Sequence, residues 1–445
     1  MLRRELRELF RLALPLAAAQ AGTQFMTIVD IAVLGRYSAR DLAAVGFANS
    51  FYFGVTVIGM GAVFGIDPLI SQAVGAGDAI RARRALWQGI WFAIAVTAVL
   101  TVPLLAGAVV MRHVGVEHEL IEPATQYLLI RATGLGPLLL FLVIRAYLQA
   151  LSITRPMIIA MVAANIINFF GDILLVFGAG PVPALGAAGA AMSTVAASLI
   201  ELAIVAIAVK AVSVPPHSEN VRRWNTADVL RAARVGWPVS LQLGAEVGIF
   251  ALVGVLAALL GTVPLAAHQV VLGLASFTYT AALGTANAGS VRVGIAVGSR
   301  NVAATQRAGR AAFIGGAAIM SIGALTFALA PGTLARLVTN KPEVIAAAIP
   351  LFIIAALFQL SDGLQAVGSG VLRGAGDTHY GFVANLVGHW LVGAPLALYL
   401  GFNRGMGIVG LWWGLCAGLT AVALMLVHRF ERLSASPIVP VAERH

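Results

Sequence analysis

The sequence predicts an all-α polytopic membrane protein, with twelve transmembrane helices in two pseudo-symmetric six-helix bundles. Of its 445 residues, 60% are hydrophobic and only 11% are charged, whereas soluble domains carry about 25% charged residues. Hydrophobic stretches dominate from end to end and leave no room for a sizeable soluble domain. The abundant glycine, 48 residues, suits helices that approach one another closely in lipid.

Twelve stretches are apolar and long enough to cross a bilayer core, which takes about 20 residues. Glycine and proline, the strongest helix breakers, separate most of them. The basic start MLRRELRELFR is followed by too long an apolar stretch for a signal peptide, so we expect an uncleaved first helix. The predicted spans cover residues 9–34, 45–70, 88–111, 124–148, 156–178, 187–210, 232–260, 266–291, 311–331, 345–371, 380–401 and 406–428.

The longest polar connection, residues 213–231, is expected to be a cytoplasmic linker between an N-terminal bundle (1–212) and a C-terminal bundle (232–445). With the N-terminus inside, the inner connections hold most of the 29 Lys and Arg residues. This bias predicts that both termini are cytoplasmic. It also accounts for the net charge of +10 without a nucleic-acid partner. The single cysteine, Cys416, excludes a disulfide framework and a cysteine metal site.

The two halves resemble each other at a constant offset of 223 residues. Pro15 in LALPLAAAQ matches Pro238 in VGWPVSLQL, and Gly75 in AVG matches Gly298 in a second AVG. Each match is weak alone, but the shared offset indicates an internal duplication. Because each half has six spans, both would have the same orientation in the membrane. We expect them to be related by an axis along the membrane normal, with a cavity between them.

Asp30 lies in the first span, LALPLAAAQAGTQFMTIVDIAVL. A carboxylate inside a membrane is costly and usually handles an ion, a proton or a substrate. Burial disfavours its ionised form, so such a group can take up and release a proton. The alternative is a charge that reaches the outer membrane surface, because Arg36 is only six residues away.

Asn168 and Asp172 are four residues apart in the fifth span, so they share one helix face. Their amide and carboxylate oxygens suit a hard cation such as sodium. Thr194 lies at a small-residue helix contact, GAAGAAMSTV, with Ala190 one turn earlier. The alternative for these residues is structural hydrogen bonding between packed helices.

Glu246 in LQLGAEVGIF and Asp362 in FQLSDGLQAVGSG lie deep in the seventh and tenth spans. Neither is near a helix end, and neither has an arginine close by in its span, although a structural ion pair is the alternative. We therefore expect an external partner: a proton, a metal cation or a cationic substrate. His268 and His389 are expected to be satisfied histidines at helix contacts.

The sequence contains no GxxxxGK[ST] phosphate loop, so direct use of ATP is not expected. It also lacks an HExxH motif and any evident nucleophile–base set. We therefore expect a protein that is not an enzyme and needs no cofactor.

On these residues the chain resembles the multidrug and toxic compound extrusion (MATE) family, in particular its NorM-type bacterial members. The likeness covers essentially the whole chain. The resemblance implies two six-helix bundles around a central cavity that work by alternating access. It also implies a secondary active antiporter that exports organic cations and hydrophobic drugs in exchange for sodium ions or protons. The stretches that carry it are LALPLAAAQ, VDIAVLG, SQAVGAGD, IRAYLQALSITRPM, NFFGDILLVFG, GAAGAAMST, GWPVSLQLGAEV, LAAHQ and QLSDGLQAVGSGVLRGAGDT.

The resemblance further assigns roles to six residues. Asp172 departs from the pattern, since several NorM-type proteins have an amide there, so which half binds the coupling ion stays open. The implied set is Asp30 as the N-half coupling acid, Asn168, Asp172 and Thr194 as its companions in a possible sodium site, and Glu246 and Asp362 in a possible second cation site.

A monomer in the bacterial inner (plasma) membrane follows from the same resemblance. The alternative function is a lipid-linked sugar flippase of the same superfamily, whose cavity would carry arginine for pyrophosphate. Buried acids argue against such an anionic substrate. A channel or receptor without coupled transport is disfavoured by the duplicated chain with intramembrane acids.

Overall fold

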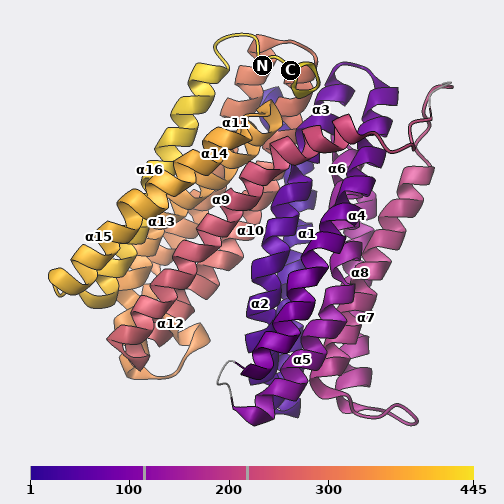
Figure 1. The fold of residues 1–445 in the computed structure, drawn as a ribbon. Coiled ribbons are helices and arrows are strands. Elements are labelled where there is room, and N and C mark those ends of the chain that lie inside the picture. The colour runs from indigo at the N-terminus through magenta and orange to yellow at the C-terminus, as the bar shows by residue number, and fades with distance from the viewer. Residues whose placement is uncertain (1, 114–116, 217–219, 445) are drawn as a thin grey trace. The chain divides into compact units, whose positions relative to one another are not determined.

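A computed structural model describes residues 2–113, 117–216 and 220–444, which are almost entirely helical (Figure 1). Residues 217–219 of the predicted linker lie outside the described residues. The first repeat contains α1 (Leu2–Tyr37), α2 (Ala39–Phe64), α3 (Ile66–Gly75), α4 (Ala79–Val110), η1 (Met111–His113), α5 (His118–Thr133), α6 (Leu135–Ala150), α7 (Arg155–Phe177) and α8 (Gly186–Lys210).

The second repeat has its six spans in the same order as the first. It ends in a short tail with one turn of 3₁₀-helix. Its elements are α9 (Thr226–Leu260), α10 (Thr262–Gly298), α11 (Val302–Leu329), α12 (Pro331–Val338), α13 (Pro342–Ala375), α14 (Thr378–Asn385), the π-helical η2 (Leu386–Gly393), α15 (Ala394–Leu398), the π-helical η3 (Tyr399–Asn403), α16 (Gly407–Leu433) and η4 (Val441–Glu443).

These helices confirm the predicted spans, and most extend several residues beyond the predicted ends. In the described part of the chain, eleven helical stretches are long and apolar enough to cross a membrane. The remaining predicted span, residues 266–291, corresponds to α10, which has 37 residues but is less apolar. Its Thr280, Thr285 and Ser290 side chains are buried within the protein, so they are shielded from lipid. The protein is therefore a multi-pass membrane protein of the predicted class.

The repeat extends to the helix caps. The side chain of Asp78, before α4, accepts the backbone N–H of Arg81 at 2.8 Å. At the equivalent position before α11, Asn301 accepts the N–H of Ala304 at 2.9 Å. Such caps satisfy one of the free N–H groups of a helix start. Asp78 and Asn301 are 223 residues apart, so both halves begin their third span in the same way.

The chain forms two compact units, each described here by itself. Unit 1 comprises Met1–Ala17, Ser71–Gly77 and Leu241–His445, and unit 2 comprises Ala18–Ile70 and Asp78–Ser240. Helices α1 and α9 each contribute to both units. They change unit at equivalent positions of the repeat, two residues after Pro15 and Pro238. The division at residues 213–231 stays a prediction.

In unit 1, the ends of α3 and α10 pack backbone to backbone. A Cβ atom at Gly75 would collide with the backbone of Ile295, and one at Gly298 would collide with that of Gln72. Gln72 also donates its side-chain N–H to the Gly374 carbonyl at 3.0 Å. These contacts hold the end of α3 against the second repeat.

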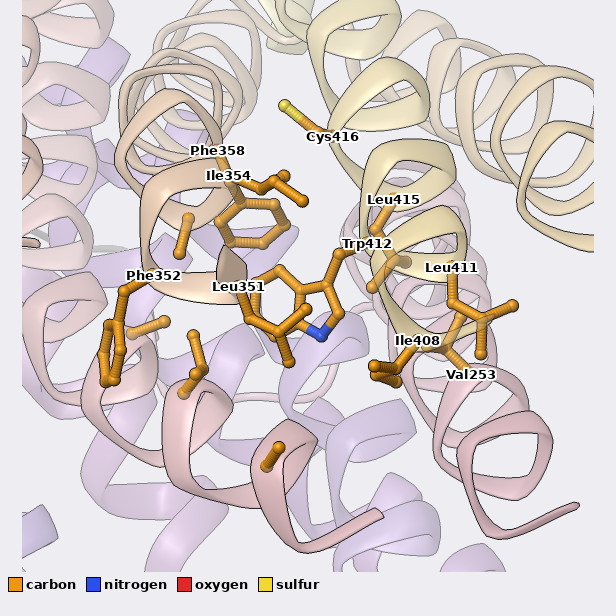
Figure 2. Packing of buried hydrophobic residues seen from close by; sticks show 14 of the residues in the cluster. Val253, Leu351, Phe352, Ile354, Phe358, Ile408, Leu411, Trp412, Leu415 and Cys416 are labelled. Atoms are coloured by element: carbon orange, nitrogen blue, oxygen red, sulfur yellow. The ribbon is translucent and has the colours of Figure 1, made fainter. Parts of the chain in front are cut away.

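The apolar core of unit 1 surrounds Trp412 of α16 (Figure 2). Its ring lies 5.7 Å from that of Phe358 and 5.8 Å from that of His268, centre to centre. His268 and His389 are buried at helix contacts, as predicted. However, their ring nitrogens have no hydrogen-bond partner among the described residues. The expectation that hydrogen bonds satisfy the ring nitrogens of these histidines is therefore wrong, because the rings pack against the aromatic side chains of Phe250 and Trp412.

In unit 2, α7 and α8 approach so closely that a Cβ atom at Gly189 would lie 2.5 Å from the Leu175 carbonyl oxygen. Small residues permit this spacing. Met26 of α1, Ala164 of α7 and Ala197 of α8 form a small buried core. The three helices thus meet, and they carry the polar residues described next.

Candidate functional site

Three helices of unit 2 bring Asp30, Asn168, Asp172 and Thr194 together, a group named here the N-half cluster. Asp30 comes from α1, Asn168 and Asp172 from α7, and Thr194 from α8. Thr194 Oγ1 donates to Asp30 Oδ2 at 3.2 Å. The Asp30 carboxylate also interacts with the side chains of Asn168 and Asp172. Asp30 is therefore engaged inside the unit, which favours the interior position over a charge that reaches the membrane surface.

Ser193 orients Asn168. The Ser193 hydroxyl donates to the backbone carbonyl of Asn168 at 2.8 Å and lies 3.3 Å from its Nδ2. This arrangement leaves the amide oxygen of Asn168 free to accept. Four buried oxygens of the cluster have no hydrogen-bond partner among the described residues: Asp30 Oδ1, Asn168 Oδ1 and both carboxylate oxygens of Asp172. A buried acceptor without a donor costs about 1–3 kcal/mol, so a proton or a cation would stabilise the cluster.

The chemistry of the N-half cluster fits a hard monovalent cation. Carboxylate, amide and hydroxyl oxygens are the ligands that such ions prefer. Within the described chain, no group of three or more His, Cys, Asp or Glu side chains could hold a metal ion. The cluster itself offers two carboxylates, one amide and one hydroxyl. A proton on Asp30 or Asp172 would satisfy the same oxygens.

Arg131 of α5 is a neighbour that the sequence reasoning missed. Its charge acts on the Asp30 carboxylate. The guanidinium lies over the Tyr52 ring, 4.5 Å from the ring centre, and interacts with Tyr127. Tyr52 and Tyr127 are both buried. Arg131 falls inside the predicted span 124–148 and lies within the helical stretch 118–150 of the structure. A charged residue inside a predicted span was the signal that could have found it.

In unit 1, Glu246 and Asp362 form the C-half cluster with Tyr279 and Gln365. Glu246 Oε1 accepts from the Tyr279 hydroxyl at 3.5 Å, and Oε2 accepts from Gln365 Nε2 at 3.0 Å. The charges of Glu246 and Asp362 act on each other. Asn385 of α14 also interacts with Glu246 and is fully buried.

No arginine or lysine of the described chain is among the neighbours that act on Glu246 or Asp362. Arg373 acts on Tyr279 rather than on either acid. The role of Glu246 and Asp362 in binding a cation stays a prediction. Tyr279, Gln365 and Asn385 were missed by the sequence reasoning. Only Gln365 carries a local signal, because it lies one turn after Asp362 on the same helix. The N-half cluster belongs to unit 2 and the C-half cluster to unit 1.

Comparison with known proteins agrees with the internal duplication. The MatE family model matches the chain twice, over residues 15–174 and 238–399. A probable multidrug resistance protein NorM from Deinococcus radiodurans is 36% identical over 445 residues, covering 96% of this chain and 95% of that protein. Another from Rhizobium meliloti is 33% identical over 439 residues, covering 96% and 94%. The solved structure of the eukaryotic MATE transporter AtDTX14 superposes with a TM-score of 0.85 at 22% identity, over 96% of each chain.

Proposed function

Because this chain belongs to the MatE family, we propose that it is a secondary active multidrug efflux antiporter of the NorM type. It exports organic cations and hydrophobic drugs in exchange for sodium ions or protons that enter the cell. The observation that supports this proposal is that each cluster contains two acids that the described chain does not fully neutralise. Both carboxylate oxygens of Asp172 have no hydrogen-bond partner among the described residues, and no basic residue is among the neighbours that act on Glu246 or Asp362. An acid in a membrane interior is costly unless a proton or a cation neutralises it, and an exchangeable partner of this kind is what an antiporter needs.

Competition explains the coupling. An ion that binds from outside neutralises the acids, and a cationic drug then loses its counter-charge and leaves to the outside. The ion is released inside, where the acids again attract drug. Exchange requires that ion and drug favour different states or exclude each other. Among the described residues, Arg131 is the one arginine whose charge acts on any of the four acids. This excess of acids argues against the anionic substrate of a lipid-linked sugar flippase.

The location in the cell is inferred from the relatives, and the orientation from the charge of the connections. The resemblance to NorM-type proteins supports a monomer in the bacterial inner membrane. Both termini would lie in the cytoplasm, because the basic connections lie on one side of the predicted spans. Neither a cofactor nor a catalytic reaction is part of this proposal, and no nucleic-acid partner is needed to account for the positive net charge.

Ethidium transport in vesicles tests the function. The protein is reconstituted in liposomes, and a sodium gradient and a proton gradient are imposed separately. We expect one of the two gradients to drive ethidium accumulation against its own gradient, while the other has little effect. Equal ethidium movement with and without both gradients would contradict coupled exchange and indicate a channel.

A further inference from the structure

The connection between α8 and α9 borders a cavity that neither cluster uses. The cavity has a volume of about 370 Å³, within the range of small-ligand sites, and lies entirely in unit 2. Because it is formed where two membrane helices are joined, it belongs at the membrane surface. Its lining consists of Arg84, Asn220, Arg223, Trp224, Asn225 and Thr226.

The described part of this connection is fixed on the start of α4. Gln88 Nε2 donates to the Arg223 carbonyl at 2.8 Å, and Gln88 Oε1 accepts the Asn225 N–H at 2.9 Å. The Trp91 indole N–H donates to the Arg222 carbonyl at 2.8 Å. Gln88 is 2% exposed. Three hydrogen bonds to α4 therefore fix the backbone that forms the wall of the cavity.

Tryptophan and arginine surround the cavity together. The Trp224 ring, which lines it, lies 6.4 Å from that of Trp91, and the Arg222 guanidinium lies 5.0 Å from the centre of the Trp87 ring. Tryptophan is enriched at the level of lipid headgroups, where its ring is in apolar surroundings and its N–H is in polar ones. These rings place the cavity at that level.

The charge around the cavity is positive. One acid near the cavity, Asp228, forms ion pairs with two arginines. Its carboxylate oxygens lie 2.9 Å from Arg84 Nε and 2.8 Å from Arg231 Nη1. Arg222 and Arg223 add two further positive charges beside the cavity. Arginine binds phosphate oxygens through its planar fork of donors.

We propose that this cavity binds the phosphate headgroup of an anionic phospholipid from the membrane leaflet that faces the connection between α8 and α9. Arg84 and Arg223, which line the cavity, hold the phosphate. Trp224 and Trp91 contact the adjoining glycerol and acyl carbons. The bound lipid would anchor the connection at the membrane surface. This site is independent of the ion and drug exchange proposed above.

Lipid binding to the purified full chain in detergent tests the site. Phosphatidylglycerol is titrated while the melting temperature is measured, with phosphatidylcholine and inorganic phosphate in parallel. We expect phosphatidylglycerol alone to raise the melting temperature. Arg223→Gln and Trp224→Leu should each weaken its binding at least fivefold. Arg307→Gln is the matched control, because Arg307 is equivalent to Arg84 in the other repeat and lies outside this cavity.

Three results would overturn the proposal. Equal stabilisation by phosphatidylcholine would show that the headgroup charge is not recognised. Equal stabilisation by inorganic phosphate would indicate a site for free anions. Equal binding by Arg223→Gln, Trp224→Leu and Arg307→Gln would place the lipid elsewhere. Because the readout is binding, a failure here leaves ethidium exchange unaffected, and a failure of exchange leaves this test intact.

Discussion

At the residue scale, the two clusters differ in whether a positive charge lies near their acids. With both carboxylates ionised, Asp30 and Asp172 carry two negative charges beside one guanidinium, that of Arg131. One monovalent cation or one proton then neutralises the N-half cluster. Glu246 and Asp362 have no such partner among their described neighbours. Organic cations are therefore expected to compete for the C-half cluster at least as strongly as for the N-half cluster.

Replacing Asp30 or Asp362 by asparagine removes the charge and keeps the shape. We expect each variant to lose at least tenfold of gradient-driven ethidium efflux, because the amide cannot bind a proton or attract a cation. The measurement is transport in vesicles with the amount of inserted protein held equal. Glu431→Gln is the control, since Glu431 forms a half-exposed ion pair with Arg310. Unchanged efflux in both Asp30→Asn and Asp362→Asn would refute the proposed role of the acids.

Replacing Arg131 by glutamine removes the positive charge that acts on Asp30. The cluster then attracts cations more strongly, by about 1 kcal/mol or roughly fivefold in affinity. Binding of the coupling ion should therefore tighten, and its release should become slower. Arg131→Lys keeps the charge and separates this effect from the loss of contact with Tyr52. An ion affinity unchanged in Arg131→Gln would show that the arginine has only a packing role.

At the element scale, close helix contacts depend on glycine where one backbone meets another. Gly298 of α10 is such a position, since its Cβ would collide with the Gln72 backbone. We expect Gly298→Ala to lower the free energy of unfolding by about 1–3 kcal/mol, the usual cost of overpacking. Thermal denaturation in detergent measures it.

Gly273, on the same helix, serves as the comparison because nothing lies within 4 Å of its added Cβ. Gly273→Ala should leave the melting temperature unchanged or raise it slightly, since alanine is the better helix former. Equal stability of Gly298→Ala and Gly273→Ala would show that the contact between α3 and α10 tolerates a side chain.

The helices were predictable because each must bury about 20 apolar residues in lipid, a pattern that needs no knowledge of tertiary structure. The π-helical segments η2 and η3 were not predictable. They depend on close packing against α16, where a Cβ atom at Gly388 would lie 2.7 Å from the Gly418 carbonyl oxygen. That Asn168 and Asp172 share one face of α7 followed from helical spacing. The neighbours Tyr279 and Asn385 could not be found, because they come from separate helices whose packing the sequence does not reveal.

At the scale of the whole molecule, the duplication determines where the chain passes between its two units. Helix α1 changes unit after Ala17 and α9 after Ser240, at equivalent positions two residues beyond a proline. Proline removes one helical hydrogen bond and permits bending. Each unit contains one acid cluster. Helices α1 and α9 have residues in both units, so each unit that contains a cluster shares two helices with the other unit. In the exchange proposed above, these two shared helices would connect ion binding with a change in the side from which the acids are accessible.

The central claim is that ion and drug compete for the same buried acids, and ligand binding to the purified protein tests it most directly. Ethidium affinity is measured by fluorescence anisotropy in detergent while sodium concentration and pH are varied in turn. The account predicts that the coupling ion weakens ethidium binding at least tenfold, and that ethidium weakens binding of that ion by the same factor. An ethidium affinity that depends on neither sodium nor protons would contradict the account.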